Sequence, residues 1–127
     1  MHSAKLFLIL GSINAALVVM LGAFGAHGLK ARITTEMLTL FQTGVHYHLF
    51  HSLGLLVVGV VAVQIVDSVF LKWAGWLMLA GIFLFSGSLY LVSVVGIRWM
   101  GMVTPFGGLA FIAAWILFLI AIIKAPG

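Results

Sequence analysis

Residues 43–66 read TGVHYHLFHSLGLLVVGVVAVQIV, in which three histidines and a tyrosine stand at the start of a long hydrocarbon run. A helix needs about 20 apolar residues to cross a hydrocarbon core about 30 Å thick, and the run from Val45 to Val66 meets that length. The stretch therefore predicts a transmembrane helix. It also holds the only concentrated group of titratable side chains in the chain.

The composition extends this interpretation to the whole chain. Its 127 residues are 65% hydrophobic and 6% charged, with a mean hydropathy of +1.34, which a water-soluble domain could not carry on its surface. Six Lys and Arg against two acids give a net charge of +4. The basic residues stand singly between apolar runs, which indicates anchoring at lipid headgroups rather than nucleic-acid binding. The sequence holds no cysteine, which excludes thiolate sites and disulfides.

The apolar runs define the expected fold. We expect an all-α membrane protein that forms one integral membrane domain, a bundle of four transmembrane helices at about residues 6–26, 45–66, 72–96 and 105–123. Between the first two spans, Ile33, Met37, Leu40 and Phe41 recur at helical spacing among polar residues. This pattern predicts a short amphipathic helix in the membrane interface, with Gly44 as the bend into the second span.

Small and polar residues inside the spans indicate how the helices meet. Glycines and alanines four residues apart let helix backbones approach closely in lipid, as at Gly11 and Ala15 in the first span. The polar side chains within spans include Asn14 in the first and Ser86 and Tyr90 in the third. We expect them to make hydrogen bonds between helices.

The histidines share a helix face only in part. Tyr47 and His51 are four residues apart and His48 and His51 three apart, so these side chains lie on one face while His46 points away. If the second span begins near Val45, this group lies at one rim of the bundle. His27 ends the first span on the same side of the membrane.

Three interpretations of this rim compete. The histidines could be structural, hydrogen-bonding the helix ends; they could form a ligand or proton site, because ionisable residues within membranes tend to be functional; or they could bind zinc or haem. The third needs His27, His48, His51 and Glu36 at headgroup level, and we expect no metal and no cofactor. The sequence offers no carboxylate pair and no nucleophile beside a base, so we also expect no enzymatic activity.

Four blocks of residues carry a resemblance that spans nearly the whole chain. They are residues 21–27 (LGAFGAH), Thr43-Gly44 followed by Tyr47 and Phe50-His51, residues 84–90 (LFSGSLY), and residues 104–108 (TPFGG) followed by Ala114-Trp115. Together they resemble the YgdD-like family of small bacterial inner-membrane proteins of unknown function, which is similar to a small eukaryotic transmembrane protein.

The resemblance ranks the histidines and places the chain. It implies that His27, Tyr47 and His51 occupy motif positions, whereas His46 and His48 fall where other members carry different polar residues. It further implies a multi-pass protein of the bacterial inner membrane with both termini in the cytoplasm. The Lys and Arg residues do not orient the chain by themselves, because three fall on each side.

Two functions follow from these observations. The first is an accessory or assembly subunit of a larger membrane complex, or a homo-oligomer, acting through helix packing. The second is a binder or transporter of a small or lipidic ligand, with or without coupling to protons, with His27, Tyr47 and His51 at the mouth and Asn14, Ser86 and Tyr90 deeper. The second function predicts a continuous cavity that joins these six residues.

Overall fold

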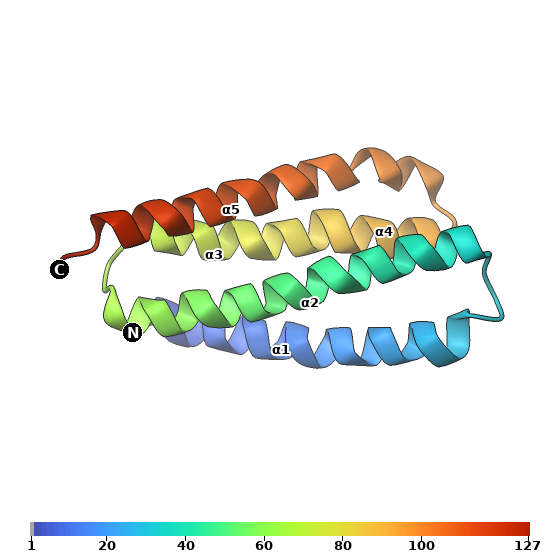
Figure 1. Cartoon of the computed structure of the whole chain (residues 1–127), viewed down its shortest axis with the longest axis horizontal. Coiled ribbons are helices and arrows are strands. Elements are labelled where there is room, and N and C mark those ends of the chain that lie inside the picture. Colours follow the sequence, from blue (N-terminus) through green and yellow to red (C-terminus); the bar gives the residue numbers. More distant parts are fainter. Residues whose placement is uncertain (1) are drawn as a thin grey trace.

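Four long antiparallel helical rods make up the computed structural model, which describes residues 2–127, with side chains from residue 3 onward (Figure 1). All four rods are long and apolar enough to cross a membrane, which confirms the expected all-α, four-span class. The elements in chain order are α1 (His2–Phe24), the π-helical turn η1 (Gly25–Leu29), α2 (Thr35–Gln64), α3 (Val69–Gly81), the π-helical η2 (Ile82–Gly87), α4 (Ser88–Tyr90), the π-helical η3 (Leu91–Val95), the 3-10 turn η4 (Arg98–Met102) and α5 (Thr104–Lys124).

Local signals explain where the rods begin and end. The side chains of Thr34 and Ser68 each accept a hydrogen bond from the backbone N–H three residues on, at 3.2 Å, and so cap α2 and α3. The third rod comprises α3, η2, α4 and η3. Gly96 ends it in the left-handed conformation, with φ 84°, which a glycine adopts without steric cost. Pro105 stands in the first turn of α5, where its missing N–H costs nothing.

The prediction of a separate interfacial helix before the second span is wrong for the described residues. α2 runs unbroken from Thr35 to Gln64, so residues 35–44 form its first turns. Gly44 does not bend the chain but makes a close contact: a Cβ there would lie 3.0 Å from the Tyr90 ring, and its carbonyl accepts a hydrogen bond from Ser86 Oγ at 2.7 Å. Phe41, expected on the apolar face of that helix, is 1% exposed inside the bundle.

The rods pair as two hairpins. α1 packs along α2, and α3 packs along α5, with α2 joined to the third rod between them (Figure 1). Gly11 faces Leu56 and Gly59 faces Leu8, where a Cβ would lie 2.8–3.0 Å from the facing side chain or backbone. The small-residue faces seen in the sequence are therefore used between helices of this chain, as expected in lipid.

The second hairpin is closed even more tightly. A Cβ on Gly107 would meet the backbone N of Phe85 at 2.3 Å, and a Cβ on Gly81 would overlap the ring of Phe111. Ala114 is fully buried two helical turns beyond Gly107 on α5. Large side chains at these positions would push α5 off the third rod.

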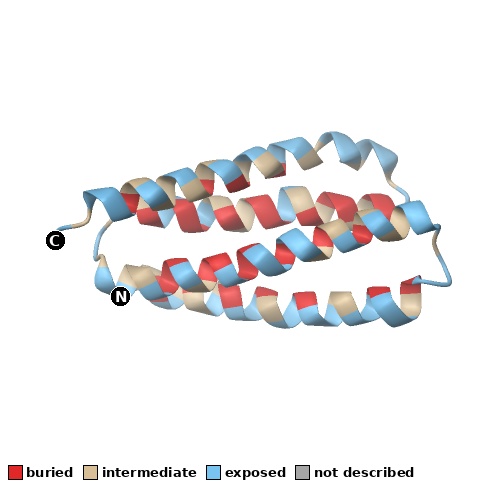
Figure 2. Cartoon of the chain, in the orientation of Figure 1, coloured by how far each residue is buried: buried red, intermediate tan, exposed pale blue. Residues whose placement is uncertain are grey.

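Buried residues line the inner faces of the rods and exposed residues cover the outside (Figure 2). The outside is itself apolar, with Ile13, Val19 and Ile123 more than half exposed, as suits a surface solvated by lipid. The buried apolar core consists of Phe7, Leu55, Val58, Leu71, Met78, Ile82, Phe111, Ala114 and Ala121.

Candidate functional site

The two buried histidines lie in the middle of α2, not at its rim. Because residues 35–44 continue the helix, His48 and His51 stand about 20 Å and 24 Å along it from Thr35, at 1.5 Å per residue. The rim position expected from a span beginning at Val45 is therefore wrong. His48 and His51 are 2% and 3% exposed, so both imidazoles belong to the interior.

His48 is the centre of a hydrogen-bonded network across three elements. Its Nε2 lies 2.9 Å from Asn14 Oδ1 of α1, and its Nδ1 lies 2.8 Å from the Tyr90 hydroxyl of α4. Asn14 Nδ2 donates in turn to the Leu10 carbonyl at 2.9 Å. This side chain therefore links both hairpins, while the low rank that the resemblance implied for His48 as a motif position stays a prediction.

The partners assign the protons of this network. The Leu10 carbonyl can only accept, so the amide nitrogen of Asn14 faces it and the amide oxygen faces His48. His48 Nε2–H then donates to Asn14, and its Nδ1 accepts the hydroxyl proton of Tyr90. A neutral imidazole thus satisfies both ring nitrogens of His48, and the network ends on a backbone carbonyl.

His51 makes a second bridge, between α2 and α5. Trp115 Nε1–H donates to His51 Nε2 at 3.0 Å, and His51 Nδ1–H donates to the Tyr47 carbonyl at 2.8 Å. An indole N–H only donates, so Nε2 of His51 is unprotonated here. The imidazole stacks on Phe111 with 3.5 Å between ring centroids and 5° between planes. His51 thus carries the opposite tautomer from His48.

The polar residues of the third rod also bond to neighbouring helices. Ser86 donates to the Gly44 carbonyl and Tyr90 to His48, as the sequence predicts, and Ser88 bonds Thr104 at the start of α5. Within residues 3–127, no buried side-chain nitrogen or oxygen lacks a hydrogen-bond partner. The interior is therefore electrostatically satisfied without a ligand.

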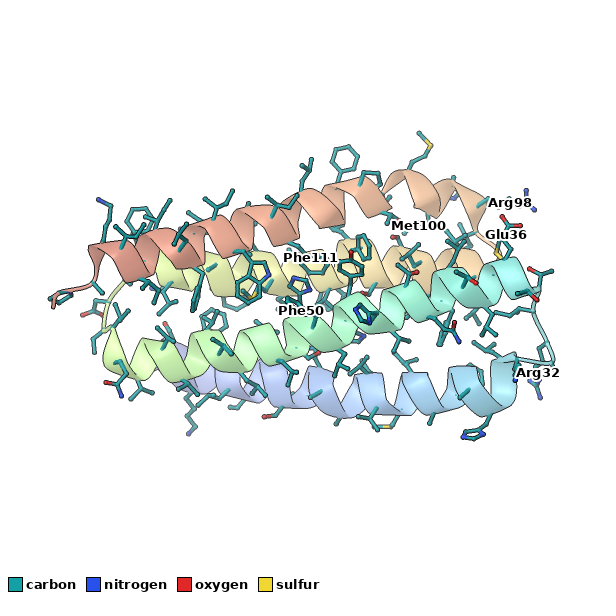
Figure 3. All side chains as sticks on the ribbon, in the orientation of Figure 1. Arg32, Glu36, Phe50, Arg98, Met100 and Phe111 are labelled. Carbon is teal, nitrogen blue, oxygen red and sulfur yellow. The ribbon has the colours of Figure 1, made fainter. Side chains whose placement is uncertain are left out.

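A groove of about 520 Å³ lies between α2 and α5, with Phe85 of η2 on its wall. It is open on the outer surface of the bundle, because Phe50 and Ile112 at its edges are 55% and 59% exposed. Figure 3 shows Phe50 and Phe111 in the space between the two helices. We call this cavity the α2–α5 groove; its lining residues are His46, Tyr47, Phe50, His51, Phe85, Gly108, Phe111, Ile112 and Trp115.

A smaller cavity of about 270 Å³ adjoins the groove on α2. It shares His46 and Tyr47 with the groove and is otherwise lined by Thr39, Gln42 and Thr43. We call this cavity the polar ledge. It lies toward the end of the bundle where Figure 3 labels Arg32, Glu36 and Arg98.

The structure brings together only part of the predicted site. Tyr47 and His51 both line the groove. His27 is exposed in η1, whose Gly25 packs against Phe41, so His27 lies level with the first turns of α2 and away from the groove. Asn14, Ser86 and Tyr90 line neither the groove, nor the polar ledge, nor the two cavities near Asp67 at the opposite end.

None of these four cavities therefore joins the six residues, as the transport hypothesis requires of one continuous cavity. In the described part of the chain, no three His, Asp or Glu side chains converge closely enough to hold a metal ion. The ring nitrogens of His48 and His51 are all engaged by protein groups. The role of the six candidate residues toward a ligand stays a prediction.

Sequence reasoning missed the aromatic wall that α5 contributes to the groove. Phe111 and Trp115 are four residues apart and so lie on one helix face, with Gly108 one turn earlier. The available signal was the position of Trp115, eleven residues into α5 and away from the interface where membrane tryptophans gather. An indole at that depth needs a hydrogen-bond acceptor, and His51 supplies it.

The family model and the individual relatives that match this chain agree on its family. Residues 21–108 match the model of the family described as "Protein of unknown function (DUF423)". The UPF0382 membrane protein YwdK of Bacillus subtilis is 52% identical over 120 residues, covering 94% of this chain and 98% of the relative. The UPF0382 membrane protein SAB0533 of Staphylococcus aureus is 45% identical over 123 residues, covering 97% and 99%.

No solved structure matches the chain at a significant level. The matched residues of the family model include Tyr47, His51, Phe85 and Gly108 of the groove, while Trp115 lies beyond them. The relatives named above are membrane proteins, in agreement with the four apolar rods. The chain therefore belongs to the DUF423 family of membrane proteins, whose function is unknown.

Proposed function

We propose that this protein binds a lipid-soluble molecule, taken from the bilayer, in the α2–α5 groove. The observation that carries the proposal is the groove itself, an aromatic cavity of about 520 Å³ that opens on the lipid-facing surface. Small-molecule sites in proteins occupy about 300–1,000 Å³ and are lined mainly by apolar and aromatic groups. The proposal is for binding, without transport through the bundle.

The chemistry of the wall favours an apolar guest. His51 is the most buried polar side chain on the wall, and both its ring nitrogens are bonded to protein groups. Phe85, Phe111 and Trp115 complete the inner surface. A guest there gains contact with ring faces and forms no new hydrogen bond with the inner wall.

Gly108 makes the proposal testable without disturbing the core. A Cβ on Gly108 would lie 3.9 Å from the Phe85 ring, an ordinary contact, so a larger side chain would extend into the groove. Gly101 is a matched control, since nothing lies within 4 Å of its Cβ position and it lies outside the groove.

The first experiment uses Trp115 as the reporter, in a variant with Trp73, Trp76 and Trp99 replaced by Phe. A nitroxide-labelled fatty-acid methyl ester is titrated into the purified protein in detergent. We expect saturable quenching of Trp115 fluorescence, lowered at least about tenfold in apparent affinity by Gly108→Leu and unchanged by Gly101→Leu. Ile112→Phe is a second variant that fills the groove, and it adds no indole that would interfere with the fluorescence of Trp115.

Quenching that does not saturate, or that Gly108→Leu and Ile112→Phe leave unaltered, would overturn the proposal. Circular dichroism of each variant separates a blocked groove from a lost fold. The new side chains of the two blocking variants enter the groove from different positions on α5. Loss of binding in both variants would therefore come from filling the groove and not from a local distortion at one position.

A second candidate function is an accessory or assembly subunit, or a homo-oligomer. Gly108 favours it, because this glycine is not required by any contact within the chain and lets another backbone approach the open edge of α5. Crosslinking in the native membrane, followed by mass spectrometry, tests it. A protein that stays monomeric and crosslinks to no other chain would contradict this candidate.

We also propose that the protein has no enzymatic activity and no resident cofactor, and that it lies in the bacterial inner membrane with both termini in the cytoplasm. The lack of a nucleophile beside a base in the sequence supports the first point. Helical spans are the usual form in inner membranes, whereas outer-membrane proteins are barrels. The resemblance to YgdD-like proteins supports the orientation. Membrane fractionation and terminal reporter fusions test these points.

A further inference from the structure

We infer that the guest is a membrane phospholipid, with one acyl chain in the α2–α5 groove and its phosphate group at the polar ledge. The inference rests on the proposed function and names the chemistry of the ligand. It is carried by two cavities of different polarity along α2 that share His46 and Tyr47 in their walls.

The groove and the ledge share two side chains. His46 and Tyr47 line both cavities, and their rings meet edge to face with 6.0 Å between centroids. On one side of this pair the wall is aromatic, from Phe85 to Trp115. On the other side it is polar, with two threonines and Gln42. A guest that fills both cavities must be an amphiphile.

The ledge presents hydrogen-bond donors. Gln42, His46 and Tyr47 make no side-chain hydrogen bond to another residue of the part from residue 3 onward, so an amide, an imidazole and a phenol are available to a guest. Thr39 and Thr43 donate their hydroxyl protons to carbonyls one turn earlier, at 3.0 Å each. No carboxylate lines the groove or the ledge. This donor set suits an acceptor-rich phosphodiester.

Depth and charge agree with a lipid of one leaflet. From Thr39 to His51 the site runs about 18 Å along α2, somewhat more than half of a hydrocarbon core about 30 Å thick. The ledge is the end nearer the charged residues Lys30, Arg32, Glu36 and Arg98, of which three are basic. The tail therefore points toward the bilayer centre and the phosphate toward the headgroup layer, as in the surrounding membrane.

The experiment compares three brominated lipids as quenchers of Trp115. The protein with Trp115 as its only tryptophan is placed in nanodiscs of dioleoylphosphatidylcholine, with rising fractions of brominated phosphatidylglycerol, phosphatidylcholine or diacylglycerol carrying the same chains. We expect the relative association constant at the Trp115 site, fitted from each quenching curve, to be about fivefold higher for either phospholipid than for diacylglycerol, because only the phospholipids engage the ledge.

Variants locate the effect. Gln42→Leu with His46→Leu removes donors from the ledge and is expected to bring the phospholipid curves to that of diacylglycerol. Gln64→Leu, an exposed substitution at the other end of α2, is expected to leave the curves unchanged. Phosphatidylglycerol ahead of phosphatidylcholine would assign the preference to an anionic head, and equal curves to the phosphate alone; both outcomes support a phosphodiester at the ledge.

The outcomes separate this inference from the proposed function. If diacylglycerol quenches as well as the phospholipids, and Gly108→Leu abolishes quenching by all three, the groove binds apolar chains and the phosphate inference fails. If Gly108→Leu changes nothing with any lipid, both the inference and the proposed function fail. If a helix of another protein occupies the groove, crosslinking that helix to this protein would abolish the quenching of Trp115 by lipid. That result would also overturn the inference.

Discussion

His48 and His51 lie three residues apart on one helix and serve different neighbours. His48 faces Asn14 and Tyr90, while His51 faces Trp115 and Phe111. In lipid an unpaired polar group is expensive, and each imidazole here has two polar partners. Both side chains thus hold helices together, and only His51 also touches the groove.

Replacement of His48 by leucine is expected to destabilise the protein by about 1–3 kcal/mol, because it leaves the Asn14 amide oxygen and the Tyr90 hydroxyl without partners. Unfolding in mixed micelles of mild detergent and dodecyl sulfate measures the change. His46→Leu is the matched control, since His46 is exposed on the same helix and makes no such bond. Equal loss of stability in both variants would show that the network contributes nothing specific.

At the scale of the helix, the adjacent glycines Gly107 and Gly108 differ in how closely they are packed. The backbone of Phe85 occupies the space where Gly107 would carry a Cβ, at 2.3 Å from its N, whereas Gly108 has room for one. Gly107→Ala is therefore expected to lower stability by about 1–3 kcal/mol through displacement of the third rod. Gly108→Ala is expected to be neutral or to stabilise by up to about 1 kcal/mol, because alanine favours the helix.

Thermal unfolding of the two alanine variants, side by side in one detergent, checks this pair. The order of the two melting temperatures decides the matter, since both substitutions add the same methyl group to the same helix turn. A Gly108→Ala protein less stable than Gly107→Ala would mean that α5 does not approach Phe85 as described.

Much of the element scale could be predicted from the sequence, and the exceptions have physical causes. Hydropathy predicts the four spans, because the length of an apolar run is a local signal. The status of Gly44 depended on Tyr90 and Ser86, which lie more than forty residues away, so a local pattern could not tell a bend from a contact.

The candidate site was predictable only in part for the same reason. Tyr47 and His51 share a helix face through spacing alone, and both line the groove. The groove also needs Phe111 and Trp115, and their approach to α2 follows from the pairing of α5 with α3. The π-helical turns η2 and η3 that carry Ser86 and support Tyr90 likewise depend on packing and leave no clear mark in the sequence.

At the scale of the whole molecule, four antiparallel rods place both termini at one end, with the connection between α2 and α3 (Figure 1). The sequence has no cysteine, so single cysteines give labelling without background. We expect Ala31→Cys and Gly101→Cys to react with a membrane-impermeant maleimide from one side, and Val66→Cys and Pro126→Cys from the other. Any pair that divides differently would contradict the four-span topology.

The bond between Asn14 and His48 has a consequence for synthesis. Both residues belong to the first hairpin, which is complete once about half of the chain has left the ribosome. These two polar side chains can therefore pair with each other before Tyr90 has been synthesised. When the second hairpin packs against the first, the His48 side chain is already held by Asn14. The Tyr90 hydroxyl then donates to the free Nδ1 of His48.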